Sequence, residues 1–317
     1  MENVFIEKQD MQKLCDLFKE KLNINNPISL YDIPSAIKDI SFYNNSNYSN
    51  LNYLDLYLEG KISEHTFGLK YIPSNAFYYN MFMRSVTFPR CVSVYENAFE
   101  QCTSLEYVGL PNVLVLGNRA FAACDNLSTI DISNCTNIGI DAFRFCENLE
   151  TVNLNSISSV TILSGAFYCC SKLKNINLQN AKINNDAFYN CQSLESITIN
   201  LSQPLSSRAF FGCTNLQTAL LHCNSLGSYA FNGCTSLSVV SYYGSIIYSS
   251  CFLNCTSLSK LYLYSRSCNL VNSNAFAGTG ITSRTGTIYV LSSYYSTYFN
   301  SSKWSYFKYQ FVSFTSS

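Results

Sequence analysis

Charge is the first thing this sequence has little of. Its 317 residues carry 20 basic and 20 acidic side chains, 13% of the chain, and the formal net charge is zero. Because nucleic acids and anionic membranes attract strongly basic proteins, this balance gives no reason to expect either partner. Residues 1–40 hold 12 of the 40 charged side chains, so this stretch differs in composition from the rest.

Long apolar runs are also missing. No stretch approaches the ~20 apolar residues that a membrane-spanning helix needs, so no span is expected. Residues 1–20 lack a basic region followed by an apolar run and a small-residue cleavage site, so no signal peptide is expected. We therefore predict a chain that is not exported by the usual signal.

Histidine and catalytic motifs are scarce as well. The two histidines are His65 and His222, and there is no Gly-rich phosphate loop, HExxH or EF-hand string. His222 precedes Cys223, which suggests a Cys/His nucleophile, but Cys223 belongs to a periodic cysteine column described below. We predict no enzymatic activity, no cofactor and no metal.

What the sequence does have is a repeat, Ala-Phe-x-x-Cys-x-x-Leu. Its phenylalanines recur at intervals of 21 to 24 residues, at Phe77, Phe99, Phe121, Phe143, Phe167, Phe188, Phe210, Phe231, Phe252 and Phe276. Each leucine opens an alternating stretch typical of a strand with one buried face, as from Leu127 to Ile132. This period predicts a leucine-rich-repeat solenoid, mainly β, with a parallel sheet of short strands, one per 21–24-residue coil. The phenylalanines should stack into a buried aromatic spine.

Fifteen cysteines are present, and most follow the same period. One column runs three residues after the phenylalanines, from Cys102 to Cys255, and a second holds Cys91, Cys135, Cys223 and Cys268. Cysteines stacked on adjacent strands lie ~4.8 Å apart, beyond the usual Cβ separation of a disulfide, so reduced, buried thiols are expected. The residues best placed for zinc are Cys169 with Cys170 and Cys251 with Cys255, but no Cys-x2-Cys pair repeats and histidine is scarce.

The repeat resembles the BspA-like subclass of leucine-rich repeats, with the consensus Ala-Phe-x-x-Cys-x-x-Leu-x-x-Ile-x-Leu-Pro. The resemblance covers residues 72–290, although the proline after the strand remains only at Pro89 and Pro111. The end of the chain also resembles the closing segment of that family, which makes Trp304 an expected cap residue. The resemblance implies a surface-exposed recognition or adhesion protein rather than an enzyme.

The N-terminal residues form a separate predicted module. Met11, Leu14, Cys15, Phe18 and Leu22 share one helical face, and a second short helix is expected to begin near residue 34. This stretch resembles a short segment of phage tail and other virion proteins, which implies docking; the alternative is an N-terminal cap of the solenoid. The predicted organisation is a helical docking or cap module at 1–40, a linker at 41–50, the solenoid at 51–290 and a C-terminal cap at 291–317.

The predicted ligand surface consists of strand positions that point away from the core. Tyrosine there offers contact area and a hydrogen-bonding tip at low entropic cost. The candidate binding residues are Asn153, Asn177, Leu220, His222, Tyr243, Tyr248, Tyr262 and Tyr264. The expected ligand on this sheet face is a protein or a cell-surface glycan.

Three functional hypotheses follow. The favoured one is a phage virion component (tail, fibre or head decoration) located in the virion, which contacts other virion proteins through the N-terminal module. The alternatives are a microbial surface adhesin and an effector-type protein-binding module, at the cell surface or in the cytoplasm. A homo-oligomer is compatible with each.

Overall fold

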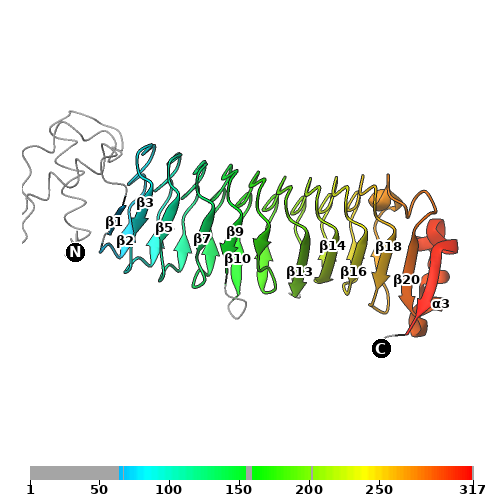
Figure 1. Ribbon diagram of the computed structural model, residues 1–317. Coiled ribbons are helices and arrows are strands. Elements are labelled where there is room, and N and C mark those ends of the chain that lie inside the picture. Colours follow the sequence, from blue (N-terminus) through cyan, green and yellow to red (C-terminus); the bar gives the residue numbers. More distant parts are fainter. Residues whose placement is uncertain (1–63, 67, 155–158, 201–202, 316–317) are drawn as a thin grey trace, which may run out of the picture. The chain divides into compact units, whose positions relative to one another are not determined.

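The computed structural model describes residues 64–66, 68–154, 159–200 and 203–315 (Figure 1). The predicted module at 1–40 and linker at 41–50 therefore lie outside the described residues. The chain divides into two compact units, Met1–Asn155 (unit 1) and Ser156–Ser317 (unit 2). Each is described by itself.

Unit 1 is a stack of coils in which every coil contributes two short parallel strands. The first strands of the coils pair as β1–β3–β5 and as β7–β9, and the second strands pair as β2–β4–β6–β8. Their bounds are β1 Glu64–Thr66, β2 Tyr71–Ile72, β3 Ser85–Thr87, β4 Ser93–Val94, β5 Tyr107–Gly109, β6 Val115–Leu116, β7 Thr129–Asp131, β8 Asn137–Ile138 and β9 Thr151–Asn153.

Unit 2 continues the same pattern and ends in short helices. Its main sheet runs in the order β13–β14–β16–β18–β20–β21, all parallel, and a smaller sheet holds β15, β17 and β19 (Figure 1). The strands of the main sheet are β13 Ser196–Asn200, β14 Thr218–His222, β16 Val239–Tyr242, β18 Lys260–Leu263, β20 Thr287–Leu291 and β21 Phe311–Phe314, and β11 Asn175–Ile176 is the equivalent strand of an earlier coil. The others are β10 Val160–Ile162, β12 Ala181–Ile183, β15 Ser225–Leu226, β17 Ile246–Ile247, β19 Asn269–Leu270, η3 Ser273–Phe276, η4 Ser292–Tyr294, α3 Tyr295–Phe299 and η5 Ser302–Gln310.

The predicted parallel solenoid, with a strand after each repeat leucine, is confirmed. The second strand of each coil was not predicted. It is often only two residues long, as at Val115–Leu116, so it has too few positions for an alternating pattern to be visible in the sequence.

The predicted aromatic spine is also confirmed. In unit 1 the rings of Phe77, Phe99, Phe121 and Phe143 stack with centroids 4.9–5.3 Å apart. In unit 2 the spacing from Phe167 to Phe276 is 5.1–5.5 Å. All of these rings are at most 1% exposed. One ring per coil therefore fills the interior at nearly the spacing of paired strands.

The buried cysteines were expected to act as small apolar core residues, and they also form hydrogen bonds between coils. The thiol of Cys124 donates to the carbonyl oxygen of Phe99, one coil earlier, at 3.1 Å, and the same bond joins Cys213 to Phe188 and Cys255 to Phe231. All 14 described cysteines are reduced, and all except Cys169 are buried. The prediction of buried, reduced thiols is confirmed, and the column of thiols also ties adjacent coils together.

The last coil replaces this cysteine with Thr279. No further coil supplies a thiol to the Phe276 carbonyl, and the hydroxyls of Thr279 and Thr282 donate to it instead. The ring of Phe276 is covered edge-on by Phe307 at 5.4 Å and by Trp304, which is 1% exposed and whose Nε1 donates to the Cys268 carbonyl at 2.7 Å. Trp304 is thus buried against the last coil, and its role as a cap residue stays a prediction.

The nine coils from Phe77 to Phe252 have left-handed backbone on both sides of the Ala-Phe or Cys-Phe pair. In one coil, Asn97 and Gln101 have φ of 54° and 62° around Ala98 and Phe99. An L side chain is strained there, which is consistent with Gly and Asn at several of these positions, although residues such as Arg119 and Ala123 occupy others.

The turn at Gly233 (φ 75°) tests this requirement, because a Cβ there would meet no atom closer than 3.8 Å. We expect Gly233→Ala to lower the free energy of unfolding by about 1 kcal/mol through backbone strain alone. Gly233→Asn should cost less, because Asn190 and Asn254 hold the equivalent turn. Urea unfolding measures both, and equal losses for the two variants would contradict the account.

A second prediction concerns pH. Burial raises the pKa of the Cys91 and Cys135 thiols to about 11. Unfolded thiols ionise near pH ~8.5, so above that pH the unfolded state releases protons that the folded state retains. The free energy of unfolding should therefore fall as pH rises from about 9 to 11, by about 1.4 kcal/mol per pH unit for each such thiol. Cys135→Ala should reduce the slope of the free energy of unfolding against pH by about 1.4 kcal/mol per pH unit. An unchanged slope would contradict the raised pKa of the Cys135 thiol.

Candidate binding surface

The main sheet of unit 2 aligns its outward side chains into columns. Strand alternation points one residue in two away from the core, and the parallel register places equivalent residues side by side. His222 stacks on Tyr243 with ring centroids 3.7 Å apart, and Tyr243 stacks on Tyr264 at 4.1 Å. We call these three residues the aromatic ladder. The structure thus brings three of the predicted binding residues into contact.

The neighbouring column contains two more of the predicted residues. Leu220, which is 36% exposed, is in register with Ser241, and Ser241 with Tyr262. The ring of Tyr262 stacks on Tyr289 at 4.4 Å. The two columns together form the outward face of the main sheet, which we call the sheet face.

Two residues of this surface were not predicted. Tyr289 lies in β20, and Phe314 of β21 stands edge-on to Tyr262 at 5.7 Å and to Tyr264 at 5.3 Å. Both follow the last recognisable repeat, so the repeat pattern did not point to them. The alternation in "TIYVL" and "FVSF" was the available signal.

The stacking determines what the ladder offers to a ligand. Tyr243 is covered on both faces by its neighbours and presents its edge and polar tip, whereas His222 and Tyr264 are each stacked on one face. Partial burial raises the pKa of Tyr243, and the nearby Tyr264 hydroxyl adds to the rise. The phenol therefore remains protonated, and able to donate a hydrogen bond, at every physiological pH.

The other predicted residues lie elsewhere. Asn153 is exposed in β9 of unit 1, in register with Asp131. Asn177 is exposed just after β11, and its Oδ1 accepts a hydrogen bond from the Gln179 amide at 3.0 Å. Tyr248, 40% exposed, follows β17 in the smaller sheet. The sheet face as built therefore consists of Leu220, His222, Tyr243, Tyr262 and Tyr264 together with Tyr289 and Phe314.

His222 and Cys223 do not form a catalytic pair. Burial raises the pKa of the Cys223 thiol to about 12, so no thiolate is present near neutral pH. The His222 ring is engaged with Tyr243. Among residues 64–66, 68–154, 159–200 and 203–315, no group of three or more His, Cys, Asp or Glu side chains is close enough to hold a metal ion.

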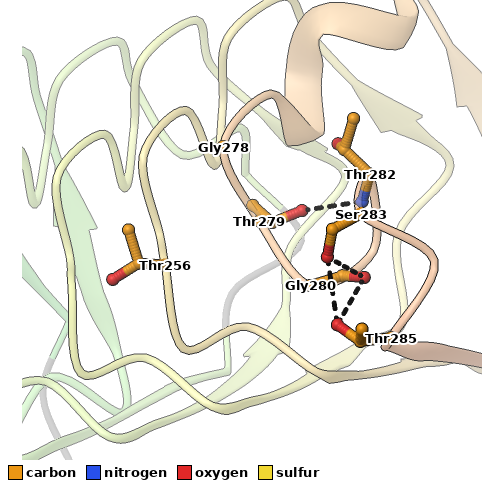
Figure 2. A pocket seen from close by; sticks show the side chains of 7 residues that line it. All are labelled: Thr256, Gly278, Thr279, Gly280, Thr282, Ser283 and Thr285. Carbon is orange, nitrogen blue, oxygen red and sulfur yellow. Dashed lines mark hydrogen bonds between the residues drawn. The ribbon is translucent and has the colours of Figure 1, made fainter.

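A hollow lies at the end of the last coil (Figure 2). Its volume is about 430 Å³, and it is lined by Thr256, Gly278, Thr279, Gly280, Thr282, Ser283 and Thr285. Its hydroxyls are already used: Thr256 donates to the Thr235 carbonyl, and Ser283 to the Gly280 carbonyl. The hollow is thus the surface of a hydrogen-bonded turn and offers no reactive group.

No described helix is both long and apolar enough to cross a membrane. The fold defines a leucine-rich-repeat solenoid with a partly aromatic sheet surface in unit 2.

Comparison with known proteins places this solenoid in a family. The model of the BspA type leucine rich repeat region matches residues 70–195 and 181–305, well over half of the sequence. The chain belongs to the BspA-type leucine-rich-repeat family. No curated protein matches the sequence.

Solved structures of similar fold come from several bacteria. A leucine rich cell surface protein from Faecalibacterium prausnitzii A2-165 is 19% identical, with a TM-score of 0.36 over 72% of this chain and 78% of its own. A leucine-rich repeat protein from Bacteroides ovatus is 21% identical, with a TM-score of 0.31 over 82% and 85%. A T. pallidum leucine rich repeat protein is 23% identical, with a TM-score of 0.40 over 56% and 78%.

Cys169 allows a test of whether the buried cysteines are inaccessible to solvent in the folded protein. It is the one described cysteine that is not buried. In a Cys15→Ser variant, which removes the cysteine outside the described residues, Ellman's reagent should modify one thiol rapidly in the native protein and all 14 in guanidinium. Cys15→Ser/Cys169→Ser is the matched control and should show no rapid reaction. Rapid modification of several thiols would show that the coils open.

Proposed function

We propose that this chain is a non-enzymatic recognition protein that binds a protein or cell-surface ligand through the sheet face of unit 2. The observation that carries the proposal is the aromatic ladder, in which His222, Tyr243 and Tyr264 stand side by side on an exposed parallel sheet. Membership of the BspA-type family supports binding or adhesion as the class of function.

The physical chemistry of the sheet face favours recognition. Tyrosine is enriched at protein interfaces because a rigid ring supplies contact area with few rotatable bonds. Stacking restricts these rings further, so less conformational entropy is lost when a partner binds. Around them lie small polar side chains such as Thr218 and Ser241, which leave the surface flat enough for a large partner.

The family supports the adhesin interpretation more directly than the virion interpretation. The virion hypothesis rests on residues 1–40, outside the described residues, and it stays a prediction, as does docking through that module. The effector interpretation differs from the adhesin in location and uses the same surface.

An array experiment tests the proposal. The labelled full chain is applied to an array of purified cell-surface ectodomains and to a glycan array. Tyr243→Ser/Tyr264→Ser should weaken specific binding by at least about tenfold, because buried tyrosines at interface centres are common hot spots.

The matched control is Tyr306→Ser/Tyr309→Ser, which removes two exposed tyrosines of η5, 54% and 88% exposed, and should leave binding unchanged. Absence of any specific partner on both arrays, or equal losses for the two double variants, would contradict the proposal.

A further inference from the structure

The zero net charge of the chain conceals a strict division along the sequence. All 20 acidic residues lie within residues 1–195, and residues 196–317 contain none. The acid-free stretch includes the whole main sheet, from β13 to β21. Six basic residues remain there: Arg208, Lys260, Arg266, Arg284, Lys303 and Lys308.

Most of this positive charge is uncompensated within the described structure. Arg208 pairs with Asp186, with Nε and Oδ1 2.9 Å apart. The other five make no ion pair with any residue that the structure describes. Lys308 lies over the ring of Phe299 at 4.5 Å, and that contact leaves its charge in place. Five of the six cations of residues 196–317 therefore have no ion-pair partner among the described residues.

Part of this charge lies on the sheet face itself. Lys260 is exposed at the start of β18, and alternation places it on the same side as Tyr262 and Tyr264. Arg266, also exposed, follows in the loop after β18. One cation at the start of β18 and one in the loop after it thus precede and follow Tyr262 and Tyr264 in the chain.

The aromatic ladder adds a weaker attraction of the same sign. An aromatic ring is negative at its face and positive at its edge. Because stacking covers both faces of Tyr243 and one face each of His222 and Tyr264, a ligand above the sheet meets mainly positive edges and hydroxyl donors. Both favour carboxylate oxygens, which accept hydrogen bonds and carry negative charge.

We infer that the sheet face of unit 2 binds a protein segment rich in Asp and Glu. This inference rests on the proposed function and specifies its partner. A neutral glycan is disfavoured because the central ring of the ladder, Tyr243, has no open face and residues 196–317 contain no carboxylate side chain to accept its hydroxyl protons. Nucleic acid is disfavoured because tight binding requires many phosphate contacts, and the sheet face offers few cations.

Biolayer interferometry, in which the full chain is immobilised and each probe is in solution, tests the inference. The probes are a synthetic peptide of alternating Glu and Gly, the same peptide with Gln for each Glu, and heparin as an anionic glycan. We expect binding of the Glu peptide only, lost when NaCl rises from about 0.05 to 0.5 M. Lys260→Glu should weaken binding by about tenfold.

Lys303→Glu is the control, since it makes the same charge change on an exposed residue of η5 outside the sheet. Equal weakening by both variants, no binding of the Glu peptide, or tighter binding of heparin would overturn the inference. Self-association at low salt that Lys260→Glu abolishes would assign the sheet face to a second copy and would also overturn it. Array binding that depends on Tyr243 and Tyr264 but not on Lys260 or salt would leave the proposed function intact.

Discussion

The stacking of one phenylalanine per coil is the interaction on which the rest of the structure depends. A ring spacing of 4.9–5.5 Å is close to the ~4.8 Å between paired strands, so ring contact and backbone hydrogen bonding are satisfied by the same rise per coil. The cysteine thiol also donates a hydrogen bond to the phenylalanine carbonyl of the previous coil, as from Cys124 to Phe99. This bond independently constrains the distance between adjacent coils. Each coil is thereby held in register with the next.

Register is also what creates the surface. Because coils repeat at the strand spacing, equivalent outward positions of successive coils form columns. The same residue type at one position of several repeats therefore produces a continuous strip on the surface. The aromatic ladder arises in this way, since His222, Tyr243 and Tyr264 occupy the same position in successive coils. Interior and exterior positions thus have separate roles: the Phe and Cys columns maintain the stack, while the outward columns differ from coil to coil between polar, aromatic and basic residues.

The sequence predicted those parts of the structure that repeat, because repetition itself is the signal. It located the Phe spine, the reduced cysteines and five residues of the sheet face. It did not indicate that the thiols donate hydrogen bonds between coils, since donor geometry depends on the rise per coil. Nor did it indicate Phe314, which reaches Tyr264 only through the pairing of β20 with β21. The division of charge was readable from the sequence, but an average over the whole chain hid it.

The most direct test of the account is hydrogen–deuterium exchange of the full chain with and without a saturating partner identified on the ectodomain array. The account predicts added protection in peptides that cover Thr218–His222, Val239–Tyr242 and Lys260–Leu263, the strands that carry the sheet face. Protection confined to residues 1–63, to β15, β17 and β19, or to the turns at Gly233 and Asn254 would contradict it.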